Sequence, residues 1–365
     1  MTLLSKYILK GFLKIFFIIE IVMIWIFLVV DYLSHMDNFV KAKMSLASGI
    51  FFTILKIPFV IVHLTPVSII LTGVIFFGLM NRNKEVIALC SGGIALKKLY
   101  LPVIALSIVL SVFVFFMADT IMPFSSAKFN YINLTKIKKK KYITAKSSNI
   151  WITDADRIIY IDFYNPDKNE IFNISINFFD GKDIVKHIEA DNGFFKNNRW
   201  ELHNLFIAEK ADGGAFFSTD TFSKKLMKFN FNGDDLKEAI KKSDEMGIIE
   251  LWKYIKSLKL KGYDSLRYEV DFYAKLAFPI ACLIMALFGI HTGIDSSSGL
   301  KIPFAIVKSL GLAFLYWALY SFSISLGYGG IVYPVVSAFI ADILFGIFGI
   351  TFLILNEKKL LLVAR

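Results

Sequence analysis

The sequence is poor in the residues from which catalytic and metal sites are usually built. Its two cysteines, Cys90 and Cys282, each lie in or beside an apolar run, so disulfides do not organise this chain. The five histidines are scattered, and neither H-E-x-x-H nor a paired C-x-x-C accompanies them, which argues against a metal site. No G-x-x-x-x-G-K-[ST] loop is present to hold nucleotide phosphates. We therefore expect no catalytic residue, no metal and no cofactor.

Apolar and aromatic residues are in excess instead. Of 365 residues, 56% are hydrophobic and 37 are phenylalanine, and the mean hydropathy is +0.60. Six runs are long enough for the ~20-residue helix that crosses ~30 Å of hydrocarbon. They are residues 12–30, 51–79, 99–122, 273–290, 304–326 and 331–355. The sequence thus predicts a polytopic α-helical membrane protein with six transmembrane helices.

The positive charges indicate the orientation. The net charge is +11, but many lysines flank the apolar runs, as anchors of membrane helices do, so no nucleic-acid partner is expected. With six spans, the short basic segments before the first run, after the second and after the last all fall on one side. They contain Lys6, Lys10, Lys14, Arg82, Lys84, Lys97, Lys98, Lys358, Lys359 and Arg365. That side is predicted to be the cytoplasm, with both termini in it.

Between the third and fourth runs the hydrophobic period changes from that of a helix to that of a strand. In "IFNISINF" the apolar Phe172, Ile174, Ile176 and Phe178 alternate with polar residues. Comparable runs, several of them separated by turn signals such as "FDGKD", lie at 157–164, 182–190, 200–209, 214–222 and 226–231. We predict an inserted all-β domain at 123–247, outside the membrane.

The predicted organisation follows from these patterns. Residues 1–122 hold the first three membrane helices, and 272–365 hold the last three with the C-terminus. Between the β domain and the fourth span, residues 248–271 form an amphipathic connector helix. Its apolar stripe is expected to be Ile249, Trp252, Ile255 and Leu258, with Gly262 as a stop.

The stretch "NRNKEVIALCSGGIALKKLY" (81–100) places one polar, acid-bearing turn between two apolar runs. Asn83 can cap a short helix near 83–92, Glu85 then lies in its first turn where the helix dipole favours an anion, and Gly92 can end it. Its apolar patch is Val86, Ile87, Leu89 and Cys90. Such a helix at the cytoplasmic face is what a permease of the ABC type presents to a separate ATPase. The alternative is an interfacial helix resting on lipid.

Ionisable residues inside the spans are candidates for function, because hydrocarbon makes them costly. Glu20 and Asp342 lie well within predicted spans, and each fits either a proton relay or, as we favour, a group satisfied by a neighbouring helix. Lys275 lies one turn after Asp271, so a local ion pair is the simplest expectation there.

Three blocks of the chain resemble the lipopolysaccharide export permeases LptF and LptG. They are "YILKGFLKIFF", "NKEVIALCSGGIALKKLYLP" and "ELWKYIKSLKLKGYDSLRYEVDFYAKLAFPIACLIMALFGI", and with the β-rich middle they cover nearly the whole chain. Within this family, "FYAKLAFP" and "YPVVSAFIADILFGIFG" favour the LptG branch.

The resemblance implies a subunit of the Gram-negative inner membrane with a periplasmic β-jellyroll-like domain, which extracts lipopolysaccharide and passes it towards the outer membrane. It implies a paralogous permease as partner in an LptF/LptG heterodimer, a cytoplasmic ATPase dimer (LptB) that binds the ATP, LptC, and the bridge protein LptA. The family's acid that contacts the ATPase falls on Glu85. The chain is thereby expected to be a transport subunit and not an enzyme.

A protein that binds a glycolipid needs an apolar cavity for the acyl chains and cations at its outer end for the anionic head group. Candidates for these cations near the outer face are Lys41, Lys43, Lys56 and Lys275. The sequence departs from the family here, because Asp31 and Asp37 stand where lysines are expected.

Two other functions remain as alternatives, a membrane-anchored envelope sensor and a lipid-modifying membrane enzyme. The sensor requires an inner output module, for which the inner segments are short, and no nucleophile or metal constellation supports the enzyme.

Overall fold

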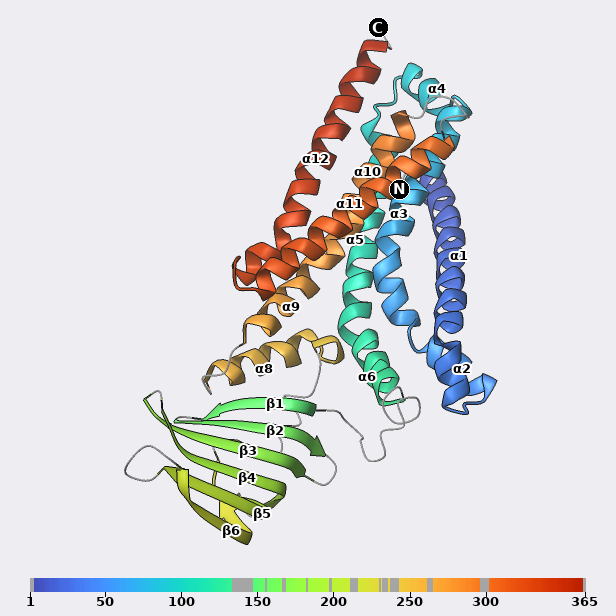
Figure 1. Ribbon diagram of the computed structural model, residues 1–365. Helices are drawn as coiled ribbons and strands as arrows, with labels where there is room; N and C mark the ends of the chain where they lie inside the picture. Colours follow the sequence, from blue (N-terminus) through green and yellow to red (C-terminus); the bar gives the residue numbers. More distant parts are fainter. Residues whose placement is uncertain are drawn as a thin grey trace.

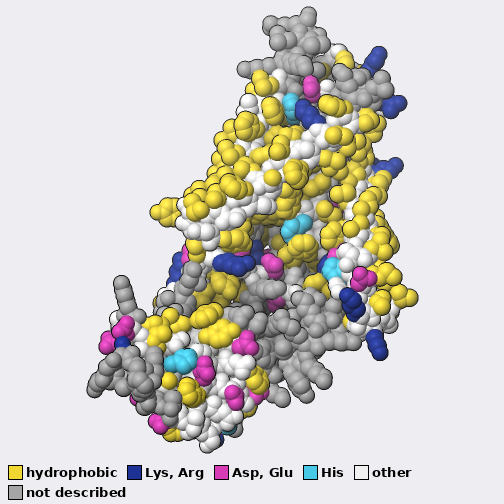
Figure 2. All heavy atoms as spheres, viewed as in Figure 1, with side chains coloured by type: hydrophobic (Ala, Val, Ile, Leu, Met, Phe, Trp, Pro, Cys, Tyr) yellow, Lys and Arg dark blue, Asp and Glu magenta, His cyan; other side chains and the backbone are white. Residues whose placement is uncertain are grey.

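The computed structural model has two parts, a tall helical bundle and a curved β-sheet at one end of it (Figure 1). The residues it describes are 3–132, 147–154, 156–165, 169–181, 183–196, 199–210, 216–229, 231, 236, 243–260, 265–295 and 302–363. Gly262, the expected helix stop, lies outside these residues. Figure 2 shows apolar side chains covering the bundle between its ends and charged ones mostly at the ends and on the sheet.

Six helical segments of the described residues are long and apolar enough to cross a membrane, which confirms the predicted fold class. In chain order they are α1 (Leu3–Lys41), α3 (Ile57–Arg82), α5 (Lys97–Phe116) continued by the π-helical turn η1 (Met117–Ile121) and α6 (Met122–Ile132), α9 (Leu266–Ala277) continued by η4 (Phe278–Ile280) and α10 (Ala281–Asp295), α11 (Ile302–Tyr328), and α12 (Pro334–Val363). The first and third are mostly exposed, whereas α3 and α10 are largely buried at the centre.

The predicted second span, 51–79, is wrong at its beginning. Residues up to Ile54 form a separate helix, α2 (Leu46–Ile54), and α3 starts only after Lys56. Pro58 lies in the first turn of α3, where its missing N–H and fixed φ are tolerated. A continuous helix through this point would lose hydrogen bonds, so the chain breaks at Lys56 and α2 packs beside α1.

Glycines allow the two central helices to approach backbone to backbone. A Cβ on Gly289 would lie 2.8 Å from the carbonyl oxygen of Ile70 and 3.2 Å from Cα of Gly73. A Cβ on Gly293 would lie 2.8 Å from the carbonyl oxygen of Gly73. Gly289 and Gly293 form a G-x-x-x-G pair, a spacing that places two small residues on one helix face. The crossing of α3 and α10 therefore requires these glycines.

The insert is a six-stranded antiparallel sheet whose strands follow one another in sequence order. They are β1 (Ser147–Asp154), β2 (Arg157–Asn165), β3 (Glu170–Asp180), β4 (Asp183–Lys196), β5 (Arg199–Lys210) and β6 (Phe216–Met227). The prediction of an inserted β domain is confirmed, but its predicted beginning at residue 123 is wrong, because α6 extends the third span to Ile132. Among the described strands the connections are those of a meander, without the crossovers of a jellyroll.

Two strand predictions need correction. β1 was not predicted, and the separate strand at 226–231 is wrong, because Leu226 and Met227 end β6. Phe229 and Phe231 then pack onto the buried face of the sheet, where the Trp200 indole N–H donates to the carbonyl of Phe231 at 3.2 Å. Phe229 and Phe231 are apolar because they are buried against the sheet, and they do not pair as a strand of it.

The predicted connector helix 248–271 is divided between two helices, and its predicted stripe is half right, because Ile255 and Leu258 pack inward but Ile249 and Trp252 do not. α8 (Ile248–Leu260) buries Leu251 and Ile255 against α9, whereas Ile249 and Trp252 are 67% and 52% exposed. Apolar residues lie on more than one face of this helix, so periodicity alone does not show which face is buried. The contact with α9 decides which face is buried.

Cross-strand ion pairs predict that the sheet loses stability in acid. Hydrogen bonds from Lys224 to Glu201 and from Lys186 to Glu209 lower the pKa of both carboxyl groups. Because the folded pKa lies below the unfolded value of about 4.3, the stabilisation is complete above that pH and is lost as the pH falls through the folded pKa. Calorimetry of the full chain in detergent between pH 6 and pH 3 should show this loss. The Glu201→Gln/Glu209→Gln variant should show a weaker pH dependence, and an unchanged one would contradict the prediction.

Candidate functional site

The short helix α4 (Glu85–Ser91) joins α3 to α5 at the end of the bundle opposite the sheet (Figure 1). It starts after Lys84, whose φ of 61° turns the chain and whose side chain makes no cap. Asn83, predicted to be the cap, instead donates from Nδ2 to Oε1 of Glu85 at 3.2 Å. The capping prediction is therefore wrong, because the left-handed Lys84 lies between Asn83 and the helix.

Glu85 is held by a residue that the sequence gave no reason to select. The Tyr7 hydroxyl on α1 donates to its Oε2 at 3.0 Å. This contact joins the first turn of α4 to the first span, across 78 positions of the chain. No spacing rule links such distant residues, so only the tertiary structure identifies Tyr7 as a partner of the acid.

The other end of α4 is closed by two consecutive glycines. Gly92 is the C-cap, as predicted, but the residue with positive φ is Gly93 at 82°. The Gly93 N–H donates to the Cys90 carbonyl and the Ile94 N–H to the Leu89 carbonyl, both at 3.0 Å. This is the Schellman arrangement, and it needs a residue that enters the left-handed region without cost.

We expect Gly93→Ala to destabilise the end of α4 by about 1–2 kcal/mol, the cost of a left-handed conformation for a residue with a Cβ. No atom lies within 4 Å of the added carbon, so the effect is conformational and not steric. Gly92→Ala is the matched control, because Gly92 has a φ of −78°. Thermal unfolding of the two purified variants measures the difference, and equal midpoints would contradict it.

The predicted apolar patch of α4 does not form one surface. Val86 is 1% exposed, and Leu89 and Cys90 pack against the bundle core. Burial also raises the pKa of the Cys90 thiol, which disfavours a reactive thiolate. Ile87 is 52% exposed. Of the predicted apolar residues, Ile87 is therefore the one that offers a large side chain to a partner.

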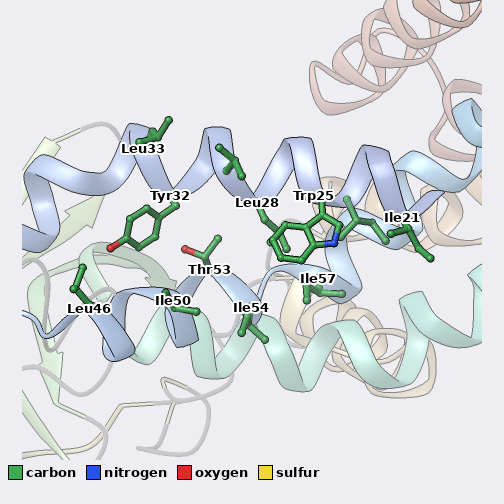
Figure 3. A pocket seen from close by; sticks show the side chains of 12 residues that line it. Ile21, Trp25, Leu28, Tyr32, Leu33, Leu46, Ile50, Thr53, Ile54 and Ile57 are labelled. Carbon is green, nitrogen blue, oxygen red and sulfur yellow. The ribbon is translucent and has the colours of Figure 1, made fainter. Parts of the chain in front are cut away.

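A second feature is an apolar groove in the half of the bundle nearer the sheet. It encloses about 840 Å³ between α1 and α2, and Figure 3 shows side chains projecting into it from both helices. Its lining is Ile21, Ile24, Trp25, Leu28, Val29, Tyr32, Leu33, Leu46, Ile50, Thr53, Ile54 and Ile57. With almost no polar surface, the groove suits hydrocarbon chains.

The four lysines predicted to meet a lipid head group do not gather at one point. Lys41 ends α1 and Lys43 lies in the turn before α2, both exposed, close in the chain to the groove helices. Lys56 also lies near the groove, and its Nζ is 2.7 Å from Asp31 and 4.8 Å from the ring centre of Phe129. Lys275 lies in α9. Asp31, one of the two acids that depart from the expected pattern, thus pairs with Lys56 inside the protein.

The acids within the spans have protein partners. The Thr65 hydroxyl donates to Glu20 at 3.2 Å, and the Tyr316 hydroxyl donates to Asp342 at 2.6 Å, so a neighbouring helix satisfies one oxygen of each acid, while the other oxygen is buried without a hydrogen bond. The predicted ion pair of Lys275 with Asp271 is wrong. Lys275 donates to the carbonyl of Met246, 2.6 Å away, because the segment that leads from the sheet to α8 reaches it.

The six spans, the inserted sheet and the lipid-sized groove define a polytopic membrane protein of permease architecture. The family described as lipopolysaccharide export system permease LptF/LptG matches residues 6–355, and the chain belongs to it. The lipopolysaccharide export system permease protein LptG of Haemophilus influenzae is 20% identical over 343 residues, which are 92% of this chain and 93% of that protein. The LptG protein of Escherichia coli strain K12 is 19% identical over 278 residues, 75% of this chain and 76% of that protein.

The family prediction and its preference for the LptG branch are thereby confirmed. Membership makes the chain a transport component of the lipopolysaccharide export system and a multi-pass protein of the inner membrane.

Proposed function

We propose that this chain extracts lipopolysaccharide from the inner membrane and passes it through its β domain, driven by a separate ATPase. The observation that carries the proposal is the family match over residues 6–355. In this arrangement the chain holds no cofactor of its own, and ATP is bound by the partner.

The groove between α1 and α2 supports the extraction step. Acyl chains prefer hydrocarbon, at about 0.8 kcal/mol for each buried CH₂, so leaving the bilayer is favoured only where an apolar surface receives them. The groove offers that surface, and Lys41 and Lys43 beside it are exposed cations suited to phosphate groups. The sheet stands at the same end of the bundle as α2, where it is placed to take over the lipid (Figure 1).

The helix α4 supports the docking of an ATPase at the other end. Its acid is held by Tyr7 and Asn83, and Ile87, two residues further along the same short helix, is exposed. A partner surface with a complementary cation and an apolar pocket would bind this pair. The same proposal places the β domain and N- and C-termini on opposite sides, periplasmic and cytoplasmic respectively.

The proposed assembly contains a paralogous permease as the second half, an LptB ATPase dimer, LptC, and the bridge protein LptA. The test is reconstitution of this chain with the paralogue and the ATPase in liposomes that contain labelled lipopolysaccharide. We expect ATP-dependent release of the label to a soluble bridge protein. Release by the isolated chain without ATP, or failure of the ATPase to bind, would overturn the proposal.

A further inference from the structure

The chain returns from the sheet to the bundle through a segment that several polar contacts hold to the bundle. This connector runs from Ser243 through the turn η3 (Ser243–Glu245) to Ile248, where α8 begins. From Ile248 the chain continues into the bundle through α8 and α9. Figure 2 shows acidic and basic side chains gathered where bundle and sheet meet.

Three helical elements, η1, α6 and α9, hold the connector by polar contacts, and α11 braces one of the contacting residues. The Ile248 N–H donates to Oδ1 of Asp119 in η1, and the Lys275 ammonium donates to the Met246 carbonyl at 2.6 Å. Two further contacts use side chains of the connector itself. Asn130 of α6 donates to Glu245 at 2.5 Å, and Ser243 donates to Asp271 of α9, which also accepts from Tyr328 at the end of α11.

Asp119 is arranged to receive the start of α8. A carboxylate at a helix N-terminus accepts an otherwise unpaired N–H and is favoured by the helix dipole. Its position on the π-helical turn Met117–Ile121 is typical of functional irregularities within helices. Gly247 permits the approach, because a Cβ there would lie 3.1 Å from the Asp119 carbonyl oxygen and 3.4 Å from Oδ1.

The charges at this point are concentrated around one lysine. The carboxylates of Asp244, Asp119, Asp271 and Glu250 all act electrostatically on Lys275. Asp244, Asp271 and Lys275 line a small cavity of about 150 Å³, whose other walls include apolar and aromatic residues of α3, η4 and α11. Polar contacts beside such a low-dielectric wall are stronger than in water and costly to leave half made.

We infer that Asp119, Asn130, Asp271, Lys275 and Tyr328 form a clasp that positions the β domain relative to spans three, four and five. The clasp residues lie on all three spans, so a displacement of one span against another changes the geometry at the connector. The clasp thereby transmits the movement of the bundle to the sheet. This inference rests on the proposed function, for which it supplies the link between the membrane helices and the domain that receives the lipid.

The test measures the position of the sheet directly, without lipopolysaccharide. Spin labels at Lys225→Cys on β6 and Ile331→Cys at the outer end of the bundle, in a Cys90→Ala/Cys282→Ala background, report the distance between the two parts in the purified complex. Asp119→Ala should raise the population of displaced distances about tenfold, the factor that corresponds to one lost contact of ~1.4 kcal/mol. Tyr328→Phe should act in the same direction from a different span.

A conservative variant and a second readout separate positioning from folding. Asp119→Asn keeps an oxygen that accepts the Ile248 N–H, so it should restore the wild-type distances. In the reconstituted complex, Asp119→Ala should lower lipid release about tenfold while ATP hydrolysis is retained. Wild-type distances in both Asp119→Ala and Tyr328→Phe, or equal losses of release and hydrolysis, would overturn the clasp. Failure of the wild-type complex to release lipid would instead overturn the proposed function and leave the distance result intact.

Discussion

Ile87→Asp is expected to abolish co-purification of this chain with the ATPase proposed as its partner. Ile87 is 52% exposed on α4, the short helix whose first residue is the acid held by Tyr7. A buried apolar anchor at an interface typically contributes about 2 kcal/mol or more, and placing a carboxylate in its pocket adds a desolvation cost. We therefore expect affinity to fall by at least about thirtyfold, measured by binding of the purified ATPase to the permease in detergent.

The controls for this variant come from the same chain. Ile331→Asp makes the same change at an isoleucine that is 75% exposed just after the end of α11, and it should leave ATPase binding unchanged. Glu85→Lys should weaken binding through the acid, whereas Tyr7→Phe removes only the hydroxyl and leaves the carboxylate available. Binding of the Ile87→Asp variant at wild-type affinity would remove α4 as the docking element.

Gly289→Leu is expected to prevent the central helices from packing. Even a Cβ at this position would lie 2.8 Å from the Ile70 carbonyl oxygen and 3.2 Å from Cα of Gly73. These are backbone atoms, so no side-chain rotation relieves the overlap and the two helices must separate. Overpacking in cores costs about 1–3 kcal/mol and more where the backbone cannot yield. We expect a loss of at least about 3 kcal/mol, visible as a large drop in folded yield and unfolding midpoint.

Gly311→Leu is the matched control, because Gly311 lies in α11 with no atom within 4 Å of its added Cβ. The same residue is introduced into a membrane helix, and only the close crossing differs. Yield and unfolding midpoint should stay near the wild-type values. Equal behaviour of the two variants would show that the crossing of α3 and α10 tolerates a larger separation.

The site shows which kinds of inference the sequence supports. The ends of α4 were nearly correct because capping is local, yet the left-handed residues are Lys84 and Gly93 and not the ones selected from the pattern. The sequence does not distinguish the exposed residue of the patch, Ile87, from Val86 or Leu89, because all three are apolar and lie within one turn and a half. Tyr7 was missed because its contact with Glu85 joins residues from different spans.

The sequence alone determined the class of this protein. Six apolar runs of this length indicate six membrane helices, since a single segment in hydrocarbon satisfies its own backbone groups only as a helix, and alternation after the third run indicates a half-buried sheet. Only the tertiary structure decided which residues act together: Asp31 with Lys56, Glu85 with Tyr7, and Lys275 with the connector at Met246. Periodicity records which face of an element is apolar, whereas these contacts depend on how separate elements pack, and one-dimensional spacing carries no information about that.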